Sequence, residues 1–205
     1  MLLTCPRALL CVVAAVGFSA LGLAATGLAV PAIAADPAQV VNQTAVEVVE
    51  LVKAKTGAER QAGFATILET RFDLPAMGQS ALGTHWARAS EQQRMRFLKA
   101  AATSEARAYS ERFGQYGGQT IVIGRVLNRP NGIFVVESQL TQINGQPIRI
   151  DWELQDRGAG LRISDVKVEG VSMVMTRRSD FSSFISRNGG DVEILIEELE
   201  SRAGR

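Results

Sequence analysis

Residues 148–155 read Ile-Arg-Ile-Asp-Trp-Glu-Leu-Gln, and their strict alternation is the clearest structural signal in this chain of 205 residues. Apolar side chains occupy every second position from Ile148 to Leu154, whereas charged and amide side chains occupy the positions between them. A period of two places each set on its own face of a β-strand, one covered by the core and one exposed to water. The segment therefore predicts a strand of an antiparallel sheet.

Three more alternating segments are expected to be strands of the same sheet, at residues 120–127, 133–143 and 161–169. The connections between the strands are short and carry strong turn residues. Residues 128–132 combine Pro with Asn-Gly, and residues 144–147 read Asn-Gly-Gln-Pro. Hairpin connections of this length favour four consecutive antiparallel strands.

The segments before the sheet have helical spacing and recognisable helix starts. Residues 36–39, Asp-Pro-Ala-Gln, combine an N-cap, a proline suited to the first turn and a capping-box glutamine. The helix that they open is expected to end at Gly57. A second helix carries an apolar stripe over residues 64–72, and a short third helix follows in residues 73–83.

A second capping box, Ser-Glu-Gln-Gln at residues 90–93, opens the longest expected helix, residues 91–116. After the sheet, helical spacing returns in residues 172–187 and 191–201. The order of helices, then strands, then helices predicts an α+β domain with an antiparallel four-stranded sheet packed against several helices.

The first 34 residues have the composition of a secretory signal peptide. Arg7 precedes an apolar run from Ala8 to Val30, and residues 32–34, Ala-Ile-Ala, form a small-x-small cleavage signature. A retained membrane anchor is the alternative, because an apolar run of this length can span a bilayer. We expect cleavage, which divides the chain into a signal peptide, residues 1–34, and a single domain, residues 35–205.

The composition of the expected mature chain excludes several classes of function. Cys5 and Cys11 are the only cysteines and leave with the signal peptide, so no disulfide or cysteine-based metal site is expected. The whole chain has 22 Lys and Arg against 21 Asp and Glu, and removal of Arg7 makes the numbers equal. A neutral domain gives no electrostatic reason to bind nucleic acid or an anionic membrane.

Residues suited to catalysis are few. His85 is the only histidine, and a solitary histidine is more often an ordinary surface or packing residue than a general base. The sequence has neither a Gly-x-Ser-x-Gly elbow nor a phosphate-binding loop ending in Gly-Lys-Ser/Thr. The carboxylates of residues 193–200 favour a solvated helix face over a metal site. We therefore expect no enzyme, no catalytic or metal site and no cofactor, although an exported enzyme that pairs His85 with a carboxylate such as Asp73 remains an alternative.

Three segments carry a family resemblance. The first is residues 72–83, followed by Trp86 and the capping box at residues 90–93. The second is residues 165–174, and the third is residues 178–181 with Gly189-Gly190 after them. In their order and spacing they resemble the MlaC/toluene-tolerance family of periplasmic phospholipid-binding proteins. Asp-Val-Lys-Val-Glu-Gly-Val-Ser, residues 165–172, is the most specific of the matches. The chain departs from the family at His85 and at Arg177, where a tyrosine is common.

The resemblance implies a soluble carrier, expected to be monomeric, in the periplasm of a Gram-negative bacterium. Such carriers hold phospholipid acyl chains in an apolar cavity between sheet and helices, leave the head group exposed, and have lipid as cargo without any cofactor. They shuttle lipid between an outer-membrane lipoprotein complex and an inner-membrane ABC transporter, which supports outer-membrane lipid asymmetry. A hopanoid-associated branch of the family, and an exported adaptor domain with a filled core, are the alternatives.

The cavity wall is expected to combine the apolar faces of two strands with those of the helices opposite them. Ala101 is the sharpest probe, because a small residue on the long helix leaves room for an acyl chain. The predicted lipid-binding residues are Leu74, Met77, Leu82, Phe97, Ala101, Tyr109, Phe113, Trp152, Leu154, Val166, Val168, Val171, Met173 and Val174.

Overall fold

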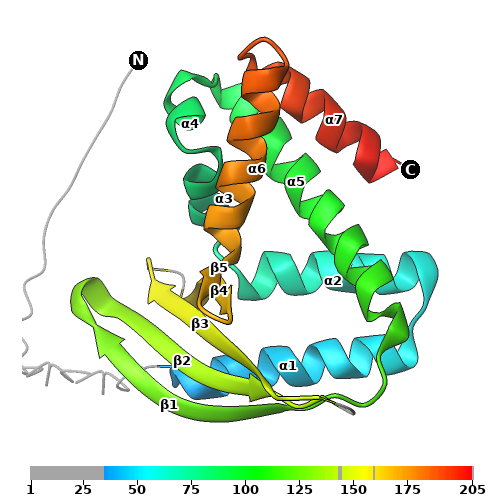
Figure 1. Cartoon of the computed structure of the whole chain (residues 1–205), viewed down its shortest axis with the longest axis vertical. Coiled ribbons are helices and arrows are strands. Elements are labelled where there is room, and N and C mark those ends of the chain that lie inside the picture. Colours follow the sequence, from blue (N-terminus) through cyan, green and yellow to red (C-terminus); the bar gives the residue numbers. More distant parts are fainter. Residues whose placement is uncertain (1–34, 143–144, 159, 205) are drawn as a thin grey trace, which may run out of the picture. The chain divides into compact units, whose positions relative to one another are not determined.

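The computed structural model describes residues 35–142, 145–158 and 160–204 (Figure 1). In this part of the chain, one antiparallel sheet of five strands in the order β1-β2-β3-β4-β5 accompanies seven α-helices. The α+β class predicted from the sequence is confirmed. The predicted signal peptide, residues 1–34, lies outside the described residues.

The sheet follows the predicted meander but has one strand more than the four expected. Residues Val171–Ser172 add a short fifth strand, which pairs with the end of the fourth. The turn between them places Glu169 at φ 50° and Gly170 at φ 81°. Two residues are too few to leave an alternating pattern, so the sequence did not reveal this strand. The strands are β1 (Ile121–Arg129), β2 (Ile133–Leu140), β3 (Ile148–Asp156), β4 (Leu161–Val168) and β5 (Val171–Ser172).

The helices begin at the predicted caps. Asp36 accepts a hydrogen bond from the Ala38 N–H at 3.0 Å, and Ser90 and Gln93 form the complete capping box. Three differences from the predicted helices stand out. Helix α1 ends at Ala54 with Lys55 as its C-cap, and Gly57 begins the next helix instead of ending the first. Residues 84–88 form an unpredicted helix, and the long helix ends at Arg112 in a 3-10 turn instead of reaching residue 116. The helices are α1 (Pro37–Ala54), α2 (Gly57–Arg71), α3 (Leu74–Leu82), α4 (Thr84–Arg88), α5 (Glu91–Arg112), α6 (Met173–Arg187) and α7 (Val192–Gly204).

Helix α1 covers the apolar face of the sheet. Figure 1 shows it running along the strands, and its Val41 is fully buried against them. Val136 of β2 and Leu154 of β3 are also fully buried in this cluster. The alternation predicted for β3 is confirmed, because Ile150, Trp152 and Leu154 are buried while the positions between them are not. The sheet and α1 therefore form a core of their own.

A second core joins the helices that follow α2. Phe97 of α5 and Ile196 of α7 are fully buried in it, and Leu82 of α3 packs beside them. At its surface, Arg96 on α5 forms ion pairs with Glu193 and Glu200 on α7. Glu193 and Glu200, which were expected on a solvated helix face, thus bind α7 to α5. None of the helices in the described part is long and apolar enough to cross a bilayer.

A buried hydrogen-bonded chain fixes the central strands. The Trp152 indole N–H donates to Ser138 Oγ at 2.9 Å, and this hydroxyl donates to the Ile150 carbonyl, also at 2.9 Å. Both side chains are buried, so neither the indole nor the carbonyl has ready access to water. Ser138 therefore satisfies a donor and an acceptor at once.

Ser138→Ala is expected to lower the free energy of unfolding by about 1–3 kcal/mol, because it leaves the buried Trp152 N–H without its acceptor. Urea denaturation followed by tryptophan fluorescence measures the change. Ser182→Ala, an exposed site on α6, is the matched control and should change stability by less than about 0.5 kcal/mol. A Ser138 variant as stable as this control would show that the hydrogen bonds of Ser138 contribute nothing to the free energy of unfolding.

Candidate functional site

An apolar cavity of about 290 Å³ lies where α2, α3, α5 and α6 meet β4. Most of its wall is aliphatic or aromatic, and the exceptions are the hydroxyl-bearing Thr176 and three charged side chains, Glu105, Arg112 and Arg177. We refer to it as the apolar cavity. Its lining consists of Leu68, Phe72, Leu74, Met77, Gly78, Ala81, Phe97, Leu98, Ala101, Ala102, Glu105, Ala108, Tyr109, Arg112, Val166, Met173, Val174, Thr176, Arg177 and Phe181.

Small residues create the space. Ala101, Ala102 and Ala108 on α5 present only methyl groups to the cavity, so these positions of the helix leave space between its larger side chains. On α3, Gly78 permits close packing, because a Cβ there would lie 2.2 Å from Leu98 Cδ2. The two helices are thus close together at Gly78 while the alanine face of α5 leaves room.

The segment that carries the most specific sequence match positions one wall. Asp165, which is 8% exposed, accepts hydrogen bonds from the backbone N–H of Val166 at 2.8 Å and of Val174 at 3.2 Å. The second bond ties the first turn of α6 to β4. Met173 and Val174 are thereby held beside Val166 in the cavity wall.

Aromatic side chains bound the cavity on α5 and α6. Phe97 and Phe181 pack edge to face, with ring centroids 5.6 Å apart. Tyr109 lies 6.2 Å from Phe64, and removal of its phenol from water, with the negative charge of Glu105 adding to it, raises the pKa of Tyr109. The phenol is therefore neutral at physiological pH, which suits an apolar wall.

The polar part of the lining is an ion pair between α5 and α6. Arg177 Nε and Nη2 donate to the two oxygens of Glu105 at 2.5 and 3.1 Å. This hydrogen bonding raises the pKa of Arg177, so the guanidinium stays charged. The pair lies at the edge of the cavity, where Arg177 is 43% exposed.

The structure brings eight of the fourteen predicted residues together around the apolar cavity. They come from three helices and one strand, and they include Ala101 on α5, the position chosen to probe the cavity. Contact of these residues with a lipid remains a prediction. The eight are Leu74, Met77, Phe97, Ala101, Tyr109, Val166, Met173 and Val174.

The other six predicted residues lie elsewhere, for identifiable reasons. The face of β3 that was expected to meet lipid is covered by α1, which buries Trp152 and Leu154. Phe113 stacks on Phe64 at 5.6 Å beyond the end of α5, and Val171 is 57% exposed on the short β5. The complete set outside the cavity lining is Leu82, Phe113, Trp152, Leu154, Val168 and Val171.

Twelve lining residues were not predicted, and a sequence signal existed for some of them. Leu68 and Phe72 belong to the apolar stripe of the second helix, and Arg177 was visible as a departure from the family pattern. The sequence gave no indication that Glu105 and Arg112 of α5 line the cavity, because their position in the wall depends on how α6 packs against α5. The twelve are Leu68, Phe72, Gly78, Ala81, Leu98, Ala102, Glu105, Ala108, Arg112, Thr176, Arg177 and Phe181.

His85 lies on α4 and is not part of the cavity lining. Its Nδ1 is 2.8 Å from Arg88 Nη2, and burial, followed by the positive charge of Arg88, lowers the pKa of His85. Asp73, considered above as its partner, instead forms an ion pair with Arg157 at 3.1 Å. Across residues 35–142, 145–158 and 160–204, no three His, Cys, Asp or Glu side chains come together as a metal site would require.

His85→Ala is expected to leave lipid binding unchanged, because the imidazole lies outside the cavity and a carrier needs no proton transfer. Bound lipid per protein, measured after organic extraction, is the readout, and the unfolding midpoint confirms that the variant folds. A folded His85 variant that no longer retains lipid would contradict this prediction and would favour a role for the imidazole in function.

An α+β fold whose helices and sheet surround an apolar cavity defines a protein able to hold an apolar ligand. The chain belongs to the MlaC protein family, whose model matches residues 39–201. The fold is similar to that of a phospholipid-binding protein from Ralstonia solanacearum, solved in complex with a phospholipid at 1.53 Å resolution. The TM-score is 0.69 at 21% sequence identity, with 83% of this chain and 98% of that chain covered. No curated protein matches the sequence significantly.

Proposed function

We propose that this protein is a phospholipid carrier that holds acyl chains in the apolar cavity. The observation that carries the proposal is the cavity itself, a space of about 290 Å³ with an apolar wall, in a member of the MlaC family. The phospholipid in the Ralstonia solanacearum protein supports the choice of ligand.

The energetics of lipid transfer explain why such a carrier is needed. Each methylene removed from water contributes about 0.8 kcal/mol, so two acyl chains with roughly 30 methylenes contribute about 24 kcal/mol. This exceeds the free energy of almost any binding equilibrium in water, so a diacyl lipid rarely leaves a bilayer unaided. An apolar cavity replaces the apolar environment of the bilayer, which makes exchange between membrane and protein nearly neutral.

The volume of the cavity indicates that loading requires rearrangement. A space of about 290 Å³ is at the lower end of the range for small-molecule sites, about 300–1,000 Å³. Two acyl chains need more room. Met77 and Met173 line the cavity, and their unbranched side chains can move aside at low cost. We therefore propose that acyl chains enlarge the cavity between α3 and α6.

The proposed setting follows from the leader sequence and the family. Cleavage after residue 34 releases a periplasmic, monomeric carrier in a Gram-negative bacterium. An outer-membrane lipoprotein complex and an inner-membrane ABC transporter are the proposed partners, and lipid asymmetry of the outer membrane is the proposed outcome. The chain itself performs no reaction and uses no cofactor. Because its sequence has no nucleotide-binding loop, the direction of transport is set by the partners.

Transfer between membranes tests the carrier function. Donor liposomes that contain a fluorescent phospholipid are separated from unlabelled acceptor liposomes by a porous filter. The protein passes through the pores of this filter, but the liposomes do not. The mature protein, residues 35–205, is expected to move label to the acceptor at a rate proportional to its concentration. A transfer rate equal to that of buffer alone, with folded protein, would overturn the proposal.

A further inference from the structure

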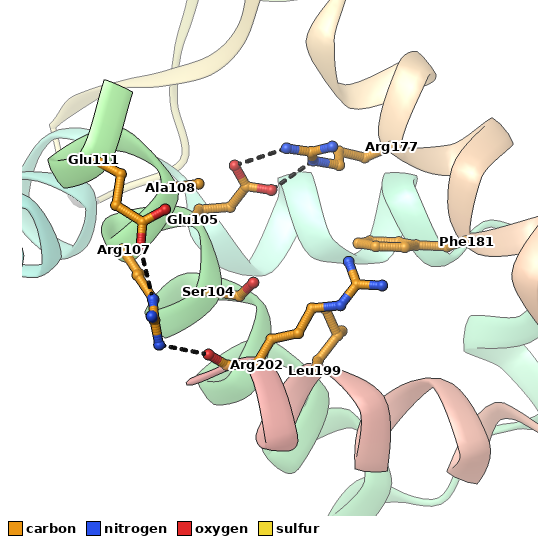
Figure 2. A pocket seen from close by; sticks show the side chains of 9 residues that line it. All are labelled: Ser104, Glu105, Arg107, Ala108, Glu111, Arg177, Phe181, Leu199 and Arg202. Carbon is orange, nitrogen blue, oxygen red and sulfur yellow. Dashed lines mark hydrogen bonds and ion pairs between the residues drawn. The ribbon is translucent and has the colours of Figure 1, made fainter. Parts of the chain in front are cut away.

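A second space, of about 340 Å³, lies beside the apolar cavity between α5, α6 and α7 (Figure 2). We refer to it as the polar hollow, because charged side chains make up more than half of its lining. Glu105, Ala108, Arg177 and Phe181 line both spaces, so they form the boundary between them. The complete lining of the polar hollow is Ser104, Glu105, Arg107, Ala108, Glu111, Arg177, Phe181, Leu199 and Arg202.

Each charged side chain of the polar hollow already has a partner of opposite charge. Arg107 binds Glu111 at 2.9 Å within α5, and Arg202 binds Glu198 at 2.7 Å within α7. The ion pair of Arg177 differs from these two, because it joins one helix to another. Figure 2 shows its two side chains pointing toward each other from α5 and α6. The hollow is thus balanced in charge, and one of its ion pairs is also a wall of the apolar cavity.

Side chains, more than backbone packing, join α5 to α6. Helix α6 packs closely against α3, α7 and β4, whereas its backbone has few close approaches to α5. Toward the C-terminal half of α6, Phe181 packs against Phe97, and Ile185 is fully buried in the same core. Toward the start of α6, Arg177 Nε and Nη2 reach Glu105 at 2.5 and 3.1 Å. The ion pair therefore closes the part of the boundary that backbone packing leaves open.

Arg177 has a second carboxylate within reach on its own helix. Its Nη1 lies 3.5 Å from Asp180 Oδ2, while its other nitrogens bind Glu105. The side chains of Arg177 and Asp180 are 43% and 58% exposed, and exposed pairs contribute little to stability. The guanidinium can therefore turn from Glu105 to Asp180 at small cost and stay paired. Only the first of these two arrangements bridges α5 and α6.

We propose that Arg177 is a gate between the apolar cavity and the polar hollow, an inference that rests on the proposed carrier function. When Arg177 binds Glu105, the two side chains form a wall that retains the acyl chains. When Arg177 binds Asp180, that wall opens and an acyl chain passes between α5 and α6. The gate controls entry and exit equally, so it sets the rate of lipid exchange and leaves the affinity for lipid unchanged.

The kinetics of lipid exchange test the gate. The mature protein, residues 35–205, is loaded with a fluorescent phospholipid and mixed with an excess of unlabelled liposomes, and the fluorescence change gives the exchange rate. Arg177→Gln and Glu105→Gln are each expected to raise this rate about threefold, the scale of one exposed ion pair, with the affinity unchanged. Raising NaCl from about 0.05 to about 0.5 M should accelerate exchange by the wild-type protein but not by Arg177→Gln, because salt screens the ion pair.

Two further variants separate the gate from a general effect of lost charge. Asp180→Ala removes the second acceptor and keeps the bridge between α5 and α6, so it is expected to slow exchange about twofold. Arg125→Gln removes an ion pair of the same forked geometry on the sheet, where Arg125 binds Glu137 at 2.9 and 3.2 Å. This control should leave the exchange rate unchanged. The unfolding midpoint verifies that each variant folds.

The reactivity of a thiol reports on the gate without any lipid. Residues 35–205 contain no cysteine, so Ala101→Cys places a single thiol in the lining of the apolar cavity. In lipid-free protein, its reaction with the uncharged reagent N-ethylmaleimide is expected to be about threefold faster when Arg177→Gln is added. Lys99→Cys places the thiol on an exposed position of α5, and its reaction rate should be the same with and without Arg177→Gln.

The two readouts keep failure of the gate distinct from failure of the carrier function. Exchange rates of Arg177→Gln and Glu105→Gln equal to that of the wild-type protein would overturn the gate and leave the carrier function intact. A folded Arg177→Gln variant that no longer retains lipid would also overturn it, because the arginine would then hold the lipid. Wild-type protein that neither retains nor exchanges lipid would overturn the carrier function, and equal thiol rates would show that the ion pair closes no path into the cavity.

Discussion

Ala101→Trp is expected to reduce the lipid bound by the purified protein at least tenfold. Ala101 lies on α5 in the wall of the apolar cavity, so the indole enters space that we propose for the acyl chains. Because that space is open, the variant should fold, with its unfolding midpoint near that of the wild-type protein. Bound lipid and thermal unfolding are measured on the same preparation.

The opposite pattern would show that Ala101 belongs to a filled core. Overpacking such a core costs about 1–3 kcal/mol, so the variant would be destabilised while its lipid content stayed unchanged. Lys99→Trp places the same side chain on an exposed position of the same helix and serves as the control. It should alter neither lipid content nor the unfolding midpoint.

Leu154→Ala is expected to have the opposite effect, a loss of stability of about 2–5 kcal/mol with the lipid content of the folded protein unchanged. Leu154 is fully buried under α1, in the core that the sheet shares with that helix. Leu154 does not line the apolar cavity, so the void left by its replacement lies outside that lining. Chemical denaturation gives the change in the free energy of unfolding.

Val122→Ala, on β1 at a side chain 57% exposed, is the matched control and should cost less than about 0.5 kcal/mol. A Leu154 variant that loses lipid but keeps its stability would contradict the structure. That result would restore the wall predicted from the alternation of β3, with the sheet face against the acyl chains.

Local chemistry explains why the helix starts could be predicted from the sequence. Asp36 and Ser90 cap the helices that they were expected to open, because a capping side chain satisfies N–H groups within three residues of itself. The alternation of residues 148–155 gave the correct buried face of β3, since strand geometry alone places side chains on alternate sides. These signals depend only on near neighbours in the chain.

The partner of each buried face could not be predicted in this way. Trp152 and Leu154 were assigned to the cavity wall because their face is apolar, but apolarity does not state whether α1 or a ligand covers it. The pairing of Glu105 with Arg177 joins α5 to α6, elements separated by the whole sheet in sequence. Periodicity contains no information on contacts of that kind.

Three of the predicted residues that the structure places in the cavity lining share one property. Leu74, Met77 and Met173 lie near helix starts that the sequence marks with caps, so both their helix and their face followed from local signals. Ala101 was selected for its small size on a long helix, and the structure places it in the lining. Small residues on an otherwise bulky helix face are thus a useful indicator of an open space.

The most direct test of the carrier function is the lipid content of the mature protein, residues 35–205, purified without detergent from a bacterial periplasm. Organic extraction followed by mass spectrometry identifies and quantifies what the protein retains. We expect about one phospholipid per protein chain in the wild type and little or none in Ala101→Trp. A folded wild-type protein that retains no lipid, and takes up none from liposomes, would contradict it and would favour a domain whose apolar surfaces serve only its own core.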